Sequence, residues 1–160
     1  MTDTNQITNQ SVDVLPCLLV PLSDRNLVLP TVTVAEMVPY KVPSRGSRGP
    51  DWYLGEIHWR NTLVPLLCYE VINGGSYPGV ASRSRIAVLN ATGLSEQLPF
   101  IGILTQGIPR LAQVENSYIR QNDDVTSAPY DFMQVAIAAE EATIPNVQAL
   151  EQAFLALDLD

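Results

Sequence analysis

Short apolar runs separated by turn-forming residues recur along most of the chain. The runs Val14–Leu22 and Leu27–Leu29 flank the polar segment Ser23–Asn26, a pattern typical of a β-hairpin. Three further runs follow downstream, at Arg85–Ala91, Phe100–Thr105 and Ile108–Val114. Many short strands with frequent turns favour an all-β barrel or sandwich.

A second hairpin is predicted in the middle of the chain. Leu54–Trp59 and Leu63–Cys68 flank a tight polar segment, Arg60–Thr62. Asparagine accepts left-handed backbone geometry, so we expect Asn61 to adopt it in this turn. The glycine-containing loop at Asn73–Ser82 then divides the chain into halves of comparable length, each with strand pairs.

Helical spacing of apolar residues appears in two segments. Val34, Met37 and Val38 share one side at that spacing, which predicts a short helix after the second strand, ended by Pro39. Near the end of the chain, Asn146 is placed to cap an amphipathic helix, which we expect to pack on its own domain. Its apolar stripe is Val147, Leu150, Phe154 and Leu157.

Charge and composition exclude several classes of function. The 160 residues suit one domain, and the net charge of -8, from 17 acidic and 9 basic side chains, disfavours nucleic acid as a partner. Residues 1–13 are polar and hold no Lys or Arg, so we expect a flexible leader rather than a signal peptide. Apolar stretches fall short of the ~20 residues that span a bilayer. We therefore expect a cytoplasmic protein without direct membrane insertion.

The sequence offers little for catalysis. His58 is the single histidine, and Cys17 and Cys68 read as buried small apolar residues rather than a disulfide or metal pair. A Cys68–His58 nucleophile pair stays open as an alternative, although no nucleophile motif surrounds Cys68. We expect no enzyme activity, no metal and no cofactor. Arg60 and Trp59 suit protein recognition, but a surface arginine beside a core tryptophan explains them equally well.

The central hairpin resembles that of the CheW-like family of chemotaxis coupling proteins. The matching segment is Gly55–Leu66, where the family typically has Gly, an apolar residue, Ile, Asn, Leu, Arg and Gly, followed by a Val/Ile-Pro-Val/Ile strand. The positions that fit are Gly55, Ile57, Arg60, Val64 and Pro65. His58, Asn61 and Cys68 depart from the pattern, standing where the family has Asn, Gly and Asp. With these departures the chain looks closer to the ChpC-type accessory coupling proteins of twitching-motility systems than to the flagellar protein.

This resemblance implies a fold, a function and a site. The fold would be two intertwined five-stranded SH3-like β-barrels within one domain, residues 14–160. Family members are non-catalytic and bridge a chemoreceptor's cytoplasmic tip to the regulatory domain of a CheA-type histidine kinase, at membrane-associated receptor arrays. By motif, Glu36, Gly55 and Arg60 would lie at the receptor-facing surface. A scaffold of the same fold serving another signalling assembly is the alternative.

Overall fold

The computed structural model describes residues 13–45 and 49–159, so the predicted leader lies outside it except for Asp13. The chain is mostly strand, which confirms the all-β prediction. In chain order the elements are β1 (Val14–Pro21), β2 (Asn26–Pro30), η1 (Thr31–Thr33), β3 (Val34–Pro39), β4 (Tyr53–Trp59), β5 (Thr62–Leu67), α2 (Tyr69–Ile72), β6 (Arg85–Asn90), β7 (Phe100–Thr105), β8 (Arg110–Glu115), β9 (Ile119–Gln121), β10 (Asp131–Ile137), β11 (Glu140–Pro145) and α3 (Val147–Leu155).

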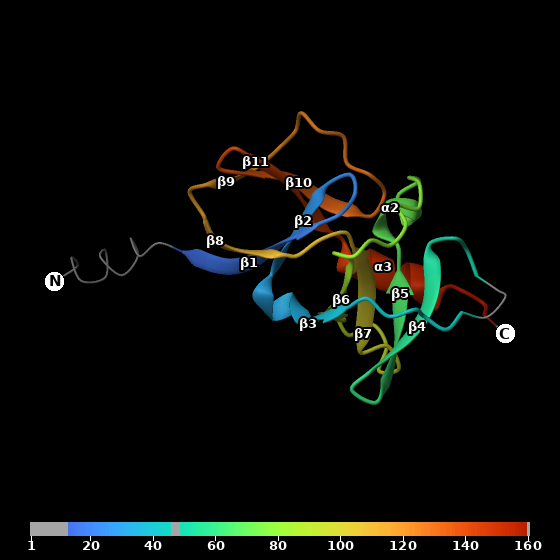
Figure 1. The fold of residues 1–160 in the computed structure, drawn as a ribbon. Helices are drawn as coiled ribbons and strands as arrows, with labels where there is room; N and C mark the ends of the chain where they lie inside the picture. Colours follow the sequence, from blue (N-terminus) through green and yellow to red (C-terminus); the bar gives the residue numbers. More distant parts are fainter. Residues whose placement is uncertain (1–12, 46–48, 160) are drawn as a thin grey trace.

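Two sheets form two barrels that lie side by side (Figure 1). The first barrel has the strand order β8-β1-β2-β11-β10-β9, and the second has the order β3-β6-β7-β5-β4. The first barrel therefore combines the start and the end of the chain, which is the intertwining that we predicted. It carries one strand more than the expected five, the three-residue β9.

The loop at Asn73–Ser82 does not separate the two barrels. It connects α2 to β6, and the strands on both sides of it belong to the second barrel. Our division of the chain into two halves at this loop was therefore wrong as a guide to the barrels. Strands that a long loop separates can still belong to one sheet, as β5 and β6 do here.

Strands shared between cores explain the unbroken apolar runs. Along β6 and β7, alternate side chains face the interior of the second barrel and a central core between the barrels. Strands β1 and β2 likewise divide their side chains between the first barrel and the same central core. A strand buried on both faces has no polar face, so it reads as continuously apolar. The central core is therefore built from both barrels.

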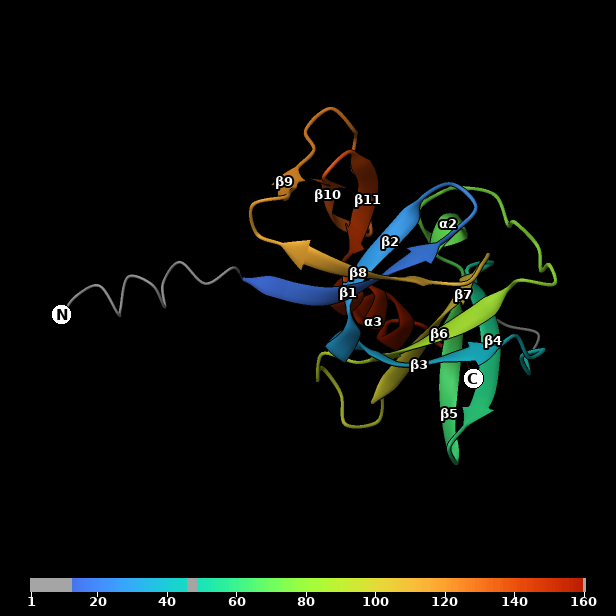
Figure 2. The same ribbon diagram turned by 60° about the vertical axis from the view of Figure 1, so that its left-hand side comes forward.

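Helix α3 completes this central core, and Figures 1 and 2 show it between the barrels. Leu150 has no exposed surface, and the rings of Phe154 and Tyr53 lie 5.6 Å apart. The Asn146 side chain accepts a hydrogen bond from the Ala149 amide at 3.0 Å, which closes the first turn of the helix. The predicted terminal helix, its cap and its packing on its own domain are confirmed.

The helix predicted over Val34–Val38 is a strand instead. A single 3-10 turn, η1, follows β2, and β3 then pairs with β6 with a bulge between Val34 and Glu36. The bulge places Val34 and Met37 together against the central core, while Val38 faces the second barrel. A bulge inserts one residue, so apolar positions that normally repeat every two residues repeat here after three. A three-residue spacing is also typical of one face of a helix, which explains the incorrect prediction.

Helix α2, directly after the second hairpin, joins the barrels through polar contacts. The buried Glu70 carboxylate accepts hydrogen bonds from the Ser23 amide and hydroxyl at 3.0 and 2.8 Å. The Asn73 side chain accepts one from the Tyr130 amide at 2.7 Å, and the Tyr69 hydroxyl oxygen lies 2.9 Å from the Tyr130 carbonyl oxygen. Ser23 and Tyr130 belong to loops of the first barrel.

Asp131 is the centre of this junction, and its side chain has no exposed surface. Its carboxylate accepts two hydrogen bonds from Arg25, at 2.8 and 2.9 Å, and one from the Tyr69 hydroxyl at 2.7 Å. Gln134 and the Ala128 amide donate two more, at 2.6 and 2.8 Å. Burial raises the pKa of Tyr69, and the hydrogen bond to Asp131 adds to this shift. The phenol therefore stays protonated and remains a donor.

We expect Asp131→Ala to destabilise the protein by about 3 kcal/mol, since it leaves buried donors and the Arg25 charge without their acceptor. The matched control is Asp24→Ala, which removes the more exposed carboxylate bound to the same arginine and should cost less than about 1 kcal/mol. Chemical denaturation of both variants measures the difference. Equal losses would show that Asp131 is not the junction's central contact.

Candidate functional site

The β4–β5 hairpin presents Arg60 at its tip. Arg60 and Asn61 form a two-residue turn with φ angles of 47° and 61°, which confirms the left-handed Asn61 and adds a left-handed Arg60. Positive φ at both central residues is the requirement of a type I′ turn. An arginine in this region is strained. Such strain is typical of functional sites when neighbouring contacts hold the residue in place.

Two neighbours hold the Arg60 side chain, which is 67% exposed. Its Nη2 donates to Glu36 Oε1 at 3.2 Å, and its guanidinium carbon lies 4.7 Å from the centre of the Trp59 ring. Trp59 itself is 6% exposed and belongs to the core of the second barrel, where its ring meets Phe100 edge-on at 4.8 Å. Trp59 is therefore a core residue, and it still contacts the exposed arginine.

Gly55 does not join Glu36 and Arg60, since it lies buried near the opposite end of β4. It sits at a bulge with φ of 124°, and a Cβ there would lie 2.5 Å from the Ser44 carbonyl oxygen. Ser44 exchanges two backbone hydrogen bonds of 2.8 Å with Glu56, next to Gly55. This bridge, together with the Glu36 contact, closes the second barrel between β3 and β4. The structure therefore gives Gly55 a role in closing the barrel.

We expect Gly55→Ala to lower the free energy of unfolding by about 2 kcal/mol or more, from backbone strain combined with the clash at Ser44. Gly93→Ala is the matched control, because Gly93 also has a positive φ, 98°, but has nothing within 4 Å of the added Cβ. It should cost about 1 kcal/mol, the cost of the left-handed backbone alone. Denaturant titration of the two variants tests this, and a Gly55 variant no worse than the control contradicts it.

Cys68 and His58 lie at opposite ends of the same hairpin. His58 is exposed and pairs with Leu63, whereas Cys68 follows the end of β5 and has no exposed surface. Burial raises the pKa of the Cys68 thiol to about 11, and its sulfur donates to Glu70 Oε1 at 3.6 Å. A nucleophilic pair needs the base within hydrogen-bond reach. The structure does not bring these two side chains together, and both cysteines are buried as predicted.

We expect thiol reagents to label Cys68 slowly in the native protein, because the thiolate reacts and its population is small below pH 11. Labelling should accelerate with rising pH and, at any pH, on unfolding. The rate with a maleimide or disulfide reagent, compared between native and denatured protein, measures this. Rapid native labelling that His58→Ala abolishes would restore the enzyme interpretation.

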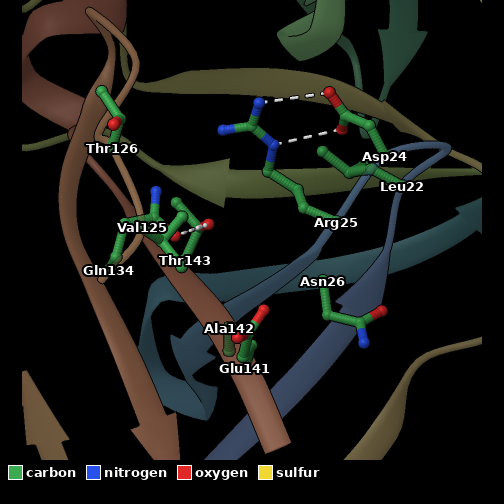
Figure 3. A pocket seen from close by; sticks show the side chains of 10 residues that line it. All are labelled: Leu22, Asp24, Arg25, Asn26, Val125, Thr126, Gln134, Glu141, Ala142 and Thr143. Carbon is green, nitrogen blue, oxygen red and sulfur yellow. Dashed lines mark hydrogen bonds and ion pairs between the residues drawn. The ribbon is translucent and has the colours of Figure 1, made fainter. Parts of the chain in front are cut away.

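A polar cavity of about 390 Å³ lies on the first barrel (Figure 3). It is bounded by the β1–β2 turn, by β10 and β11, and by the chain that precedes β10. The residues that line it are Leu22, Asp24, Arg25, Asn26, Val125, Thr126, Gln134, Glu141, Ala142 and Thr143. Arg25 is bound to Asp24 and Asp131, and Gln134 accepts from Thr143 at 2.8 Å. Most of the lining side chains can donate or accept hydrogen bonds.

Searches of the described residues for two other kinds of site found nothing. No group of three or more His, Cys, Asp or Glu side chains there could hold a metal ion. No helix in the same part of the chain has the length and apolar character to cross a membrane.

Two strand-paired sheets and an exposed arginine at one hairpin tip define a small two-barrel domain of the all-β class. Residues 16–153 match the family model described as CheW-like domain. The chain belongs to the CheW-like family, as its central hairpin predicted. Membership in this family supports an adaptor role in chemotaxis signalling.

A solved structure shows the same fold. The chain resembles the scaffolding protein TtCheW from Thermoanaerobacter tengcongensis, with a TM-score of 0.73 and 16% sequence identity over 86% of this chain and 88% of that one. Comparison with curated proteins finds no match. The predicted pair of SH3-like barrels is therefore confirmed, while the ChpC-type assignment stays a prediction.

Proposed function

We propose that this chain is a non-catalytic adaptor that couples a chemoreceptor's cytoplasmic tip to the regulatory domain of a CheA-type histidine kinase. The observation that carries the proposal is the arrangement at the β4–β5 tip. There an exposed arginine is held over a buried tryptophan and against Glu36. Receptor arrays at the membrane would be the place of action, reached through these partners.

The hairpin tip suits recognition of a protein surface for two reasons. Arg and Trp are the residue types most enriched at interface hot spots. The Arg60 guanidinium is already positioned by two contacts, so binding a partner loses less side-chain entropy than with a freely moving arginine. Leu63, on the neighbouring strand, is 51% exposed and adds apolar surface beside this polar group. We assign the receptor tip to this surface.

The kinase would bind the first barrel. Large apolar side chains are exposed there on three different strands, where a partner can cover them. They are Val14 and Leu15 on β1, Leu111 on β8 and Phe132 on β10. An adaptor needs two surfaces that can be occupied together, and placing them on different barrels meets that need.

We expect Arg60→Ala to reduce receptor-tip affinity about thirtyfold, the loss of a hot spot of about 2 kcal/mol. Stability should change by less than about 1 kcal/mol, because the ion pair is exposed and both residues carry the same left-handed backbone strain. Isothermal titration with a receptor-tip fragment and with the kinase regulatory domain, alongside thermal denaturation, gives the three quantities.

The matched control is Arg120→Ala, which removes an exposed arginine from the first barrel. It should leave receptor binding unchanged. Wild-type affinity of Arg60→Ala for the receptor would remove this surface from the site. Failure of the wild-type chain to bind any receptor tip would favour the alternative, a scaffold in another signalling assembly.

A further inference from the structure

Two donors share a single oxygen at the hairpin tip. Trp59 Nε1 donates to Glu36 Oε1 at 2.8 Å, and Arg60 Nη2 donates to the same oxygen at 3.2 Å. Trp59 also places its ring face under the Arg60 guanidinium, at 4.7 Å. Trp59 therefore contacts both charged residues, with its N–H on one and its ring on the other.

Of the three residues in this trio, Glu36, Trp59 and Arg60, only Trp59 is held by core packing. Glu36 and Arg60 have side chains that are 43% and 67% exposed, and an exposed ion pair of this kind holds its own geometry poorly. The Trp59 ring is 6% exposed and packs edge-on against Phe100 in the barrel core. An aliphatic side chain here would offer neither an N–H nor a ring face.

The trio also limits what a partner can be. Glu36 neutralises Arg60, so this pair carries no net charge, and the nearby Lys41 ammonium is engaged with the His58 carbonyl at 2.7 Å. Among the described residues, Glu36 Oε2 has no hydrogen-bond donor, and Arg60 uses only Nη2. An acceptor and several donors thus lie side by side. Backbone amides and the carboxamides of Asn or Gln carry the complementary donor and acceptor without charge.

We propose that Trp59 is a positioning residue that fixes Glu36 and Arg60 as a charge-neutral donor–acceptor pair for a neutral hydrogen-bonding surface of the partner. The part that concerns the partner rests on the proposed function. The part that concerns positioning is a property of the free protein. The two parts can therefore be tested separately.

The first test uses the free protein and ¹⁵N relaxation of the arginine Nε groups. Arg60 should be ordered in the wild type, more mobile in Trp59→Phe, which keeps the ring but loses the N–H, and most mobile in Trp59→Leu. Arg120, exposed on the first barrel, serves as the internal reference for a mobile arginine. Glu36→Ala, a change at an exposed site, repeats the test without altering the core. An Arg60 as mobile as Arg120 in the wild type overturns the positioning, whatever the partner does.

The second test measures affinity for the receptor-tip fragment. Trp59→Phe should weaken binding about five- to tenfold, the size of one net hydrogen bond, when measured well below its thermal midpoint, which the smaller core ring lowers. In a Glu36→Ala background the same change should have no further effect, because the indole N–H has lost its acceptor. Additive losses would mean that Trp59 acts only through the core, and they overturn the proposal.

Salt dependence tests the neutral partner surface. Wild-type affinity should change less than about threefold between 50 and 500 mM NaCl, because charge-neutral groups are screened little. Glu36→Gln leaves Arg60 uncompensated, and against a neutral surface it should not steepen the dependence. Lys41→Gln is measured in parallel, because the Lys41 ammonium binds the His58 carbonyl beside the tip. A steep wild-type dependence that persists in Lys41→Gln overturns the neutral surface. Normal Arg60 order without receptor binding would count against the proposed function and leave the positioning supported.

Discussion

The buried carboxylate of Asp131 is the contact on which the arrangement of the two barrels depends. It collects donors from the β1–β2 turn, from α2 and from its own strand, so that one side chain joins both barrels. A buried charge costs a large desolvation free energy unless its hydrogen bonds are satisfied. Among these bonds, the one from Tyr69 crosses between the barrels, and sliding one barrel past the other would break it together with the bonds of Glu70 to Ser23 and of Asn73 to Tyr130. The polar junction therefore favours one placement of the two barrels. The apolar central core alone would discriminate less between placements, because apolar contacts are not directional.

Because some strands are buried on both faces, the packing of each barrel depends on how the two barrels are placed relative to each other. Because β1, β2, β6 and β7 each contribute to a barrel core and to the central core, neither barrel has an independent wall on that side. Helix α3 fills the space that remains between them. The hairpin tip lies at the far side of the second barrel, built on strands whose other ends are packed in these cores. Arg60 therefore extends from a well-packed support, as the recognition that we propose for it requires.

Parts of the fold and of the site were accessible from residue patterns because the causes are local. The hairpin around Asn61 follows from turn chemistry, and the terminal helix from its stripe and its Asn146 cap. The match of Arg60 to the family pattern placed it in a hairpin turn, and the structure has it there. The pairing of Glu36 with Trp59 was not predictable in the same way, because 23 positions separate the two residues and nothing local indicates that β3 and β4 close a barrel.

Sequence alone determined the class of the protein: short strands, one capped helix, buried cysteines and the hairpin of the CheW-like family. Tertiary structure decided which strands are neighbours, turned the apparent helix at Val34–Val38 into a bulged strand, and made α2 a junction. It also paired Arg25 with Asp131, 106 positions away. The physical reason is that strand pairing and buried hydrogen bonds are satisfied by distant segments. Turns and caps, in contrast, are satisfied within a few residues.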